Sequence, residues 1–148
     1  MERAVSRGDA RQLGLSNVTL RQLRKLSKAA TIQPMVVQQR FYHKTGFERE
    51  MREWCGRHNV FFQSFWTLTA NSKNRPGSDA IISPTFRALA EKYRVAPEVL
   101  FYRFVLGEGM IPMNGTTNLE HMEADLKARL ITLEDEDARA IDALLGNM

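Results

Sequence analysis

Apolar residues recur at two different spacings along the chain. Short apolar runs at 13–16, 35–38, 60–65 and 110–113 have the length and composition of buried strands. Between them, leucines and aromatic residues recur every three or four positions, as in amphipathic helices. This pattern predicts helices over about 19–30 and 47–58, from Ser83-Pro84, from Pro97, from Leu119 and from the segment 132–135. Strands that alternate with helices predict an α/β fold with a parallel sheet.

The expected helix starts carry capping signals. Asn17 or Thr19 could cap the first helix, and Ser83 followed by proline suits the N-terminus of another. The sequence Thr132-Leu133-Glu134-Asp135 resembles a capping box before the last helix.

One stretch breaks the alternation. Residues 67–83 are polar and show no periodicity, which is typical of lids, binding loops or disordered segments. At 148 residues the chain has the length of one domain, and we expect a single domain over 1–148 that includes this long polar loop.

Composition narrows the class of protein. Hydrophobic residues make up 43% and charged residues 26%, as in globular proteins, and no apolar run is long enough to span a membrane. Met1 is followed by Glu2 and Arg3 rather than an apolar leader, so a cytoplasmic protein is expected. A single cysteine, Cys55, excludes a disulfide framework and a cysteine-based zinc site, and its place on an apolar helix face predicts a core thiol.

Charge is distributed unevenly. Residues 1–60 hold 12 Lys/Arg and 5 Asp/Glu, whereas residues 61–148 hold 9 and 12. A solvated helix face and a site for a phosphorylated ligand both explain the basic half. No nucleic-acid-binding motif is present, so no nucleic-acid partner is expected.

Polar side chains follow each predicted strand. They are Ser16-Asn17, Gln38, Ser64-Phe65 and Gly115-Thr116. The carboxyl ends of parallel strands meet at one edge of a sheet, where such folds bind ligands. Amide, hydroxyl and aromatic groups at that edge indicate a polar, planar ligand.

Four segments, taken in order, resemble the aldo-keto reductase family. They are Gly14-Leu15-Ser16-Asn17, Pro34-Met35-Val36-Val37-Gln38, Ser64-Phe65, and the run from Gly115 to Met122. Residues 39–42 and 63–70 resemble a fungal branch of the family in particular. The resemblance extends from about Gly8 to Leu145.

The family fold is a TIM (β/α)8 barrel, and its members use NADP(H), or in some cases NAD, to interconvert carbonyls and alcohols. The resemblance assigns this chain to the C-terminal half of the barrel, strands five to eight. The catalytic tyrosine, lysine, aspartate and histidine belong to the other half. We therefore expect no catalytic residue here, and no aldehyde reduction by the chain alone.

The resemblance also implies a nicotinamide-nucleotide site. Its residues would be Ser16, Asn17 and Gln38 at the carboxamide, Phe65 stacked on the nicotinamide, Trp66 and Leu68 along the pyrophosphate, and Gly115, Thr116, Thr117, His121 and Asp125 at the adenosine end. Each assignment has a structural alternative. Asn17 could cap a helix, Gln38 could be an ordinary polar residue, Phe65 could be a core aromatic, and residues 115–118 could form a capped turn.

Some positions depart from the family pattern. Many members have lysine where this chain has Gly115 and arginine where it has His121, and these groups hold the 2′-phosphate of NADP. Weak discrimination between NADP and NAD is therefore expected. Arg40 stands where many members have an acid, and the resemblance assigns it no role.

Two classes of function follow. The chain could belong to an oxidoreductase, such as a tailoring enzyme of fungal secondary metabolism, that binds a small carbonyl or alcohol substrate and whose missing half comes from a partner chain or is left out by an incomplete gene model. Alternatively, it could be a non-catalytic remnant that binds nucleotide or protein. Four strands alone leave an uncovered sheet face, with Val37, Phe62 and Ile111 as candidate exposed residues, so self-association or aggregation is expected.

Overall fold

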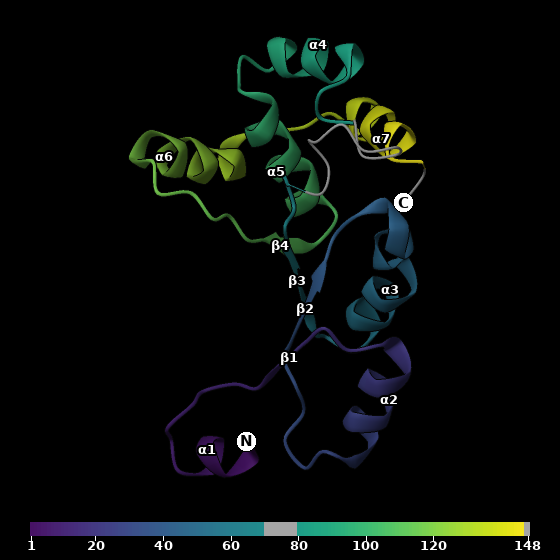
Figure 1. Cartoon of the computed structure of the whole chain (residues 1–148), viewed down its shortest axis with the longest axis vertical. Helices are drawn as coiled ribbons and strands as arrows, with labels where there is room; N and C mark the ends of the chain where they lie inside the picture. Colours follow the sequence, from purple (N-terminus) through teal and green to yellow (C-terminus); the bar gives the residue numbers. More distant parts are fainter. Residues whose placement is uncertain (70–79, 147–148) are drawn as a thin grey trace.

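The chain forms one parallel four-stranded sheet in the computed structural model, which describes residues 1–69 and 80–146. The strands lie in sequence order, β1-β2-β3-β4. Their bounds are β1 Gly14–Ser16, β2 Val36–Arg40, β3 Phe61–Phe65 and β4 Met110–Pro112. Helices connect successive strands (Figure 1). The predicted α/β fold, with about four parallel strands and covering helices, is confirmed.

All six predicted helices are present, and within its described residues the structure adds a seventh, α1. The α-helices are α1 Glu2–Ser6, α2 Leu20–Ala29, α3 Arg49–Arg57, α4 Pro84–Lys92, α5 Pro97–Gly107, α6 Leu119–Lys127 and α7 Asp135–Leu144, with short 3-10 turns η1 His43–Glu48 and η2 Ala128–Leu130. The sequence pattern does not predict α1. The carboxylate of Glu2 fixes that helix to the chain after α2, because it accepts hydrogen bonds from the backbone N–H groups of Thr31 (2.8 Å) and Ile32 (3.0 Å).

Capping explains two of the helix starts. Thr19, rather than Asn17, caps α2 and forms a reciprocal capping box with Gln22. Ser83 caps α4 by accepting a hydrogen bond from the Phe86 N–H at 3.2 Å. Of the predicted loop over 67–83, residues 70–79 lie outside the described part of the chain.

The predicted capping box at Thr132 is wrong. The N-cap of α7 is Glu134, and its side chain makes no capping hydrogen bond. The carboxylate of Glu134 contacts Lys92 Nζ of α4 instead, at 2.7 Å. The Glu134 side chain thus forms a tertiary ion pair instead of capping the N-terminus of α7.

Strand alternation separates a covered face of the sheet from an open one. Val37 and Phe62 are buried against the helices, so the expectation that they are exposed is wrong. Their neighbours in sequence, Val36 and Phe61, lie on the opposite face, and Phe61 is 51% exposed. Ile111, 40% exposed, was correctly placed there. We refer to the face that bears Phe61 and Ile111 as the open face.

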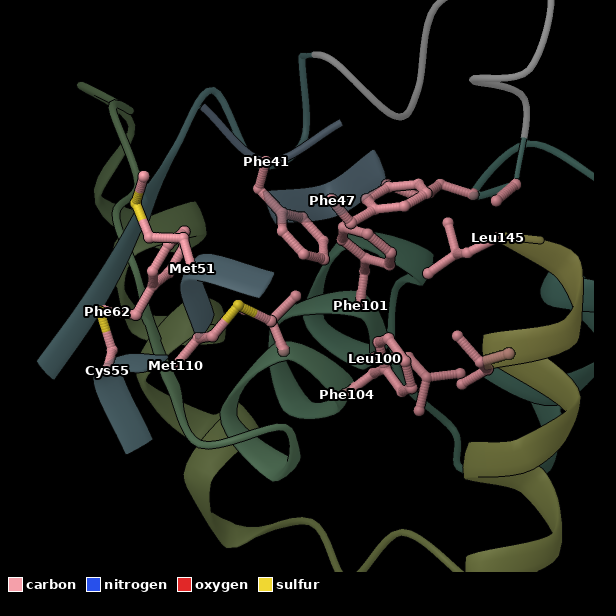
Figure 2. Packing of buried hydrophobic residues seen from close by; sticks show 14 of the residues in the cluster. Phe41, Phe47, Met51, Cys55, Phe62, Leu100, Phe101, Phe104, Met110 and Leu145 are labelled. Carbon is pink, nitrogen blue, oxygen red and sulfur yellow. The ribbon is translucent and has the colours of Figure 1, made fainter. Parts of the chain in front are cut away.

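The core lies between the covered face and the helices. Figure 2 shows Phe41 and Phe47 close to Phe101 of α5, with Leu145 on one side of the cluster, and the ring of Phe104 packs in turn on that of Phe101. Cys55 of α3 is buried beside the sheet, and burial raises the pKa of its thiol to about 11. It is the core thiol that the sequence predicts.

A polar cluster joins α4 to α7. Lys92 Nζ lies 2.7 Å from Asp137 Oδ2, and the Tyr93 hydroxyl donates to the same carboxylate. The backbone N–H of Glu134 in turn donates to the Tyr93 oxygen at 3.0 Å. The hydrogen bond from Lys92, followed by that from Tyr93, lowers the pKa of Asp137.

Asp137→Asn is expected to lower the free energy of unfolding by about 1 kcal/mol, since screening by solvent weakens the contact with half-exposed Lys92. The pKa of Asp137 is lower in the folded state, so its contribution is present above the unfolded-state pKa and is lost as the pH falls through the folded value. Urea unfolding at several pH values measures this effect. Asp135→Asn, at an exposed position in the same first turn of α7, controls for the helix dipole. An equal decrease in the free energy of unfolding in Asp137→Asn and Asp135→Asn would contradict the prediction.

Candidate functional site

Side chains from the end of β1 and the middle of β2 and β3 form a chain of hydrogen bonds. Asn17 Nδ2 donates to Ser16 Oγ (3.3 Å), and Ser16 Oγ donates to Gln38 Oε1 (3.3 Å). Gln38 Nε2 then donates to Gln63 Oε1 (3.2 Å) and approaches Met113 Sδ at 2.9 Å. We call these five residues the amide ladder. It fixes the orientation of the Gln38 amide, because the oxygen and the nitrogen each have their own partner.

Strand register produces the ladder. Ser16 pairs with Gln38, and Gln38 pairs with Gln63, so the three side chains form one row across β1, β2 and β3. Gln63 is absent from the site predicted from sequence. Its position two residues before Phe65 on the same strand was the signal, because residues i and i+2 share a face.

Two strand ends turn sharply into their loops. Asn17 has φ 54° and Trp66 has φ 58°, both in the left-handed region. Asparagine tolerates this region, whereas tryptophan seldom adopts it. The turn leaves the Trp66 side chain 52% exposed at the end of β3.

A cleft of about 780 Å³ opens beside the ladder, between the ends of β2 and β3 and helices α5 and α6. Eight of the eleven predicted site residues line it: Gln38, Phe65, Trp66, Leu68, Gly115, Thr116, His121 and Asp125. Ser16 and Asn17 do not line it and connect to it through the ladder. Thr117 is not part of its wall. The volume suits a small-molecule or cofactor site.

Helix α5 contributes wall residues that sequence reasoning missed. Glu98 and Tyr102 lie one turn apart on α5 and face the cleft. Burial, followed by the charges of Asp125 and Glu98, raises the pKa of the Tyr102 phenol. Two polar residues four positions apart on a mostly apolar helix were the available signal.

The cleft has an acidic side. Glu98 and Asp125 line it, and among the wall residues of the described chain His121 is the one basic type. Asn114 Nδ2 donates to Asp125 Oδ2 at 2.8 Å, which holds that carboxylate at the wall. The cleft therefore offers no lysine or arginine, within the described residues, to a phosphate.

The segment 115–118 forms a capped turn and also borders the cleft. Asn118 caps α6 by accepting from the N–H groups of Glu120 (2.8 Å) and His121 (3.4 Å). Thr116 Oγ1 accepts from the Asn118 N–H at 3.1 Å. A Cβ at Gly115 would have no heavy atom within 4 Å, so that edge of the cleft is open.

Over residues 1–69 and 80–146, no cluster of three His, Cys, Asp or Glu side chains could hold a metal ion. In the same part of the chain, every helix is too short or too polar to cross a bilayer.

Comparison with known proteins identifies the family. The family model described as "Aldo/keto reductase family" matches residues 1–145. The chain is 26% identical to methylglyoxal reductase DkgB of Escherichia coli O157:H7, over 95% of this chain and 50% of that protein. It is 25% identical to the NAD/NADP-dependent indole-3-acetaldehyde reductase of Schizosaccharomyces pombe, over 97% of this chain and 50% of that protein.

Solved structures show the same fold. A thermostable aldo-keto reductase in complex with epalrestat superposes with a TM-score of 0.85 at 20% identity, over 97% of this chain and 52% of that one. Aldose reductase from Giardia lamblia superposes with a TM-score of 0.78 at 21% identity, over 99% and 48%. The chain spans about half the length of the relatives it matches. The match to the family model over nearly every residue shows that the chain belongs to the aldo/keto reductase family.

Proposed function

We propose that this chain is the nicotinamide-nucleotide-binding half of an NAD(P)(H)-dependent oxidoreductase that interconverts carbonyls and alcohols. The amide ladder carries the proposal. It presents an oriented Gln38 amide next to a cleft lined by Phe65 and Trp66. Membership of the family supports the oxidoreductase class.

The ladder has the chemistry that a carboxamide requires. An amide ligand needs a donor and an acceptor close together, and the row of Ser16, Gln38 and Gln63 offers both. One Gln38 N–H points to Met113 Sδ, which is a weak acceptor, so a carboxamide oxygen is a better partner for it. When bound, the nicotinamide supplies hydride, and this half of the protein binds and orients it. By family resemblance, the acid that protonates the carbonyl belongs to the other half of the barrel, in a partner or a longer chain.

The proposed cofactor is NADP, with NAD as an accepted alternative. Glu98 and Asp125 disfavour an additional phosphate in the cleft, and His121 alone opposes them there among the described residues. We therefore propose a preference below 100-fold, which corresponds to about 2.8 kcal/mol. A tailoring role in fungal secondary metabolism is a narrower hypothesis supported by the sequence resemblance alone.

Calorimetric titration of the chain with NADP⁺ and NAD⁺ tests the site. Gln38→Leu removes the amide at similar volume and is expected to weaken both nucleotides by about tenfold or more, the effect of one or two hydrogen bonds. Phe65→Ala is expected to weaken them as well, through loss of the stacking surface. Gln12→Leu, at an exposed position, is the matched control and should leave both affinities unchanged.

Two results would contradict the proposal. One is a folded wild-type chain that binds neither nucleotide. The other is a Gln38→Leu variant that binds both as tightly as the wild type. A preference of 100-fold or more for NADP⁺ would contradict the proposed cofactor selectivity alone.

A second function, as a protein-interaction module, is favoured by a different observation. The open face leaves Phe61 and Ile111 substantially exposed on a parallel sheet. Such a face suits an apolar partner surface. The two functions are compatible if the partner completes the barrel.

A further inference from the structure

Arg40, the last residue of β2, is a cation with no acidic partner among the residues that the structure describes. Over residues 1–69 and 80–146, none of the ion pairs involves its guanidinium. Its Nε is buried and has no hydrogen-bond acceptor. A buried N–H without an acceptor is uncommon in folded proteins and calls for an explanation.

Aromatic rings hold the guanidinium in place. Its Cζ lies 4.3 Å from the centre of the Trp66 ring, 5.4 Å from that of Tyr42 and 5.9 Å from that of Phe65. Ring faces stabilise a guanidinium but accept no conventional hydrogen bond from its edge. The arrangement therefore fixes the group. Because Nε is buried, the donors available to an anion are the terminal Nη N–H groups, which take part in none of the ion pairs of the described residues.

Arg40 lies one step beyond the amide ladder. It is two residues after Gln38 on the same strand, so both side chains belong to the open face, and the separation along the strand is about 6.6 Å. Arg40 also pairs in register with Phe65, the residue proposed to stack on the nicotinamide. A molecule that reacts with the nicotinamide ring would thus be close to the guanidinium.

We propose that Arg40 binds the carboxylate of the carbonyl substrate, so that the substrates are oxo acids or aldehyde acids. The inference rests on the nucleotide site proposed above. A planar guanidinium with free edge donors matches a carboxylate in a bidentate arrangement. The nucleotide phosphates are a less suitable ligand, because Arg40 does not line the cleft, whose wall at the end of β3 is formed by Phe65 and Trp66.

The test compares 4-formylbenzoate with its methyl ester, which has the same aldehyde but no charge. Calorimetric titrations, with and without NADP⁺, are expected to show the acid binding at least tenfold more tightly than the ester to the wild-type chain. Arg40→Gln should reduce this ratio to about one, and Arg40→Lys should retain part of it because the charge remains. Arg24→Gln, at an exposed position on α2, is the control and should not change the ratio.

A second measurement does not depend on a variant. The Arg40 Nε–H resonance of the wild-type chain, observed by ¹⁵N NMR, is expected to shift on addition of the acid and not of the ester. Because Nε is buried beside the terminal Nη groups, this resonance reports on a ligand bound to the guanidinium without requiring contact with Nε itself.

The outcomes separate this inference from the proposed function. Equal affinity of the wild type for acid and ester, or an unchanged ratio in Arg40→Gln, overturns the role of Arg40. Loss of NADP⁺ affinity in Arg40→Gln with the ratio intact also overturns it and assigns the guanidinium to a nucleotide phosphate. An Arg40-dependent ratio in a chain that binds no nucleotide supports the carboxylate site and overturns the proposed nucleotide site.

Discussion

Phe101→Ala is expected to lower the free energy of unfolding by about 3–5 kcal/mol, the usual range for a phenylalanine removed from a core. Phe101 is fully buried on α5. Its ring centre lies 6.4 Å from that of Phe41, 6.0 Å from that of Phe86 and 6.2 Å from that of Phe104. The residue therefore joins α5 to the loop after β2 and to α4, and alanine would leave a cavity among three rings.

Urea unfolding followed by circular dichroism measures this loss. Phe101→Leu keeps most of the volume and should cost considerably less, which separates the cavity from a general intolerance of substitution. Leu126→Ala, at a position 69% exposed on α6, should change stability by about 0.5 kcal/mol or less. A loss below about 1 kcal/mol in Phe101→Ala would show that the aromatic cluster does not hold the core together.

The second large effect expected is self-association of the isolated chain. Parallel strands are normally covered on both faces. Here the helices cover one face, and Phe61 and Ile111 are 51% and 40% exposed on the other. The outer edges of β1 and β4 have no strand partner within residues 1–69 and 80–146. Open edges and exposed apolar side chains both favour association.

Light scattering on a size-exclusion column, across micromolar concentrations, tests this expectation. The double variant Phe61→Gln, Ile111→Gln should shift the distribution toward the monomer, because it removes the apolar side chains of the open face. Leu130→Gln, at a position 73% exposed but in η2, should not. A monodisperse wild-type species of 17.0 kDa with a cooperative thermal transition would contradict the prediction.

Sequence patterns predicted the positions of strands and helices more reliably than which residues of each strand face the helices. The strands and most helices follow from apolar spacing, which depends on local sequence alone. The pairs Val36-Val37 and Phe61-Phe62 place the same side chain on both faces, so the pattern could not decide which member faces the helices. Only the packing of the helices decides this.

In the candidate site, too, some residues could be predicted from local sequence and others only from tertiary contacts. Gln38, in the middle of β2, and Phe65, the last residue of β3, could be predicted as cleft residues because parallel topology gathers strand ends at one edge. Gln63 required the register between strands, and Tyr102 required the packing of α5 against the loop after β3. The side chain of Glu134, the N-cap of α7, pairs with Lys92, some forty residues earlier in the chain. Contacts between residues far apart in the chain cannot be predicted from the local sequence pattern.

Because Cys55 is buried, the rate of its reaction with a thiol reagent can measure how often α3 separates from the sheet. Cys55 is the only thiol, it packs against the sheet, and burial raises its pKa to about 11, so little thiolate exists in the closed form. A thiol reagent can therefore modify it only when α3 separates from β3, and the rate of labelling reports the population of that opened state. A ligand that binds across the ends of β2 and β3 would slow the labelling without touching the cysteine. Nucleotide or substrate binding could thus be followed chemically, without an assay of catalytic turnover.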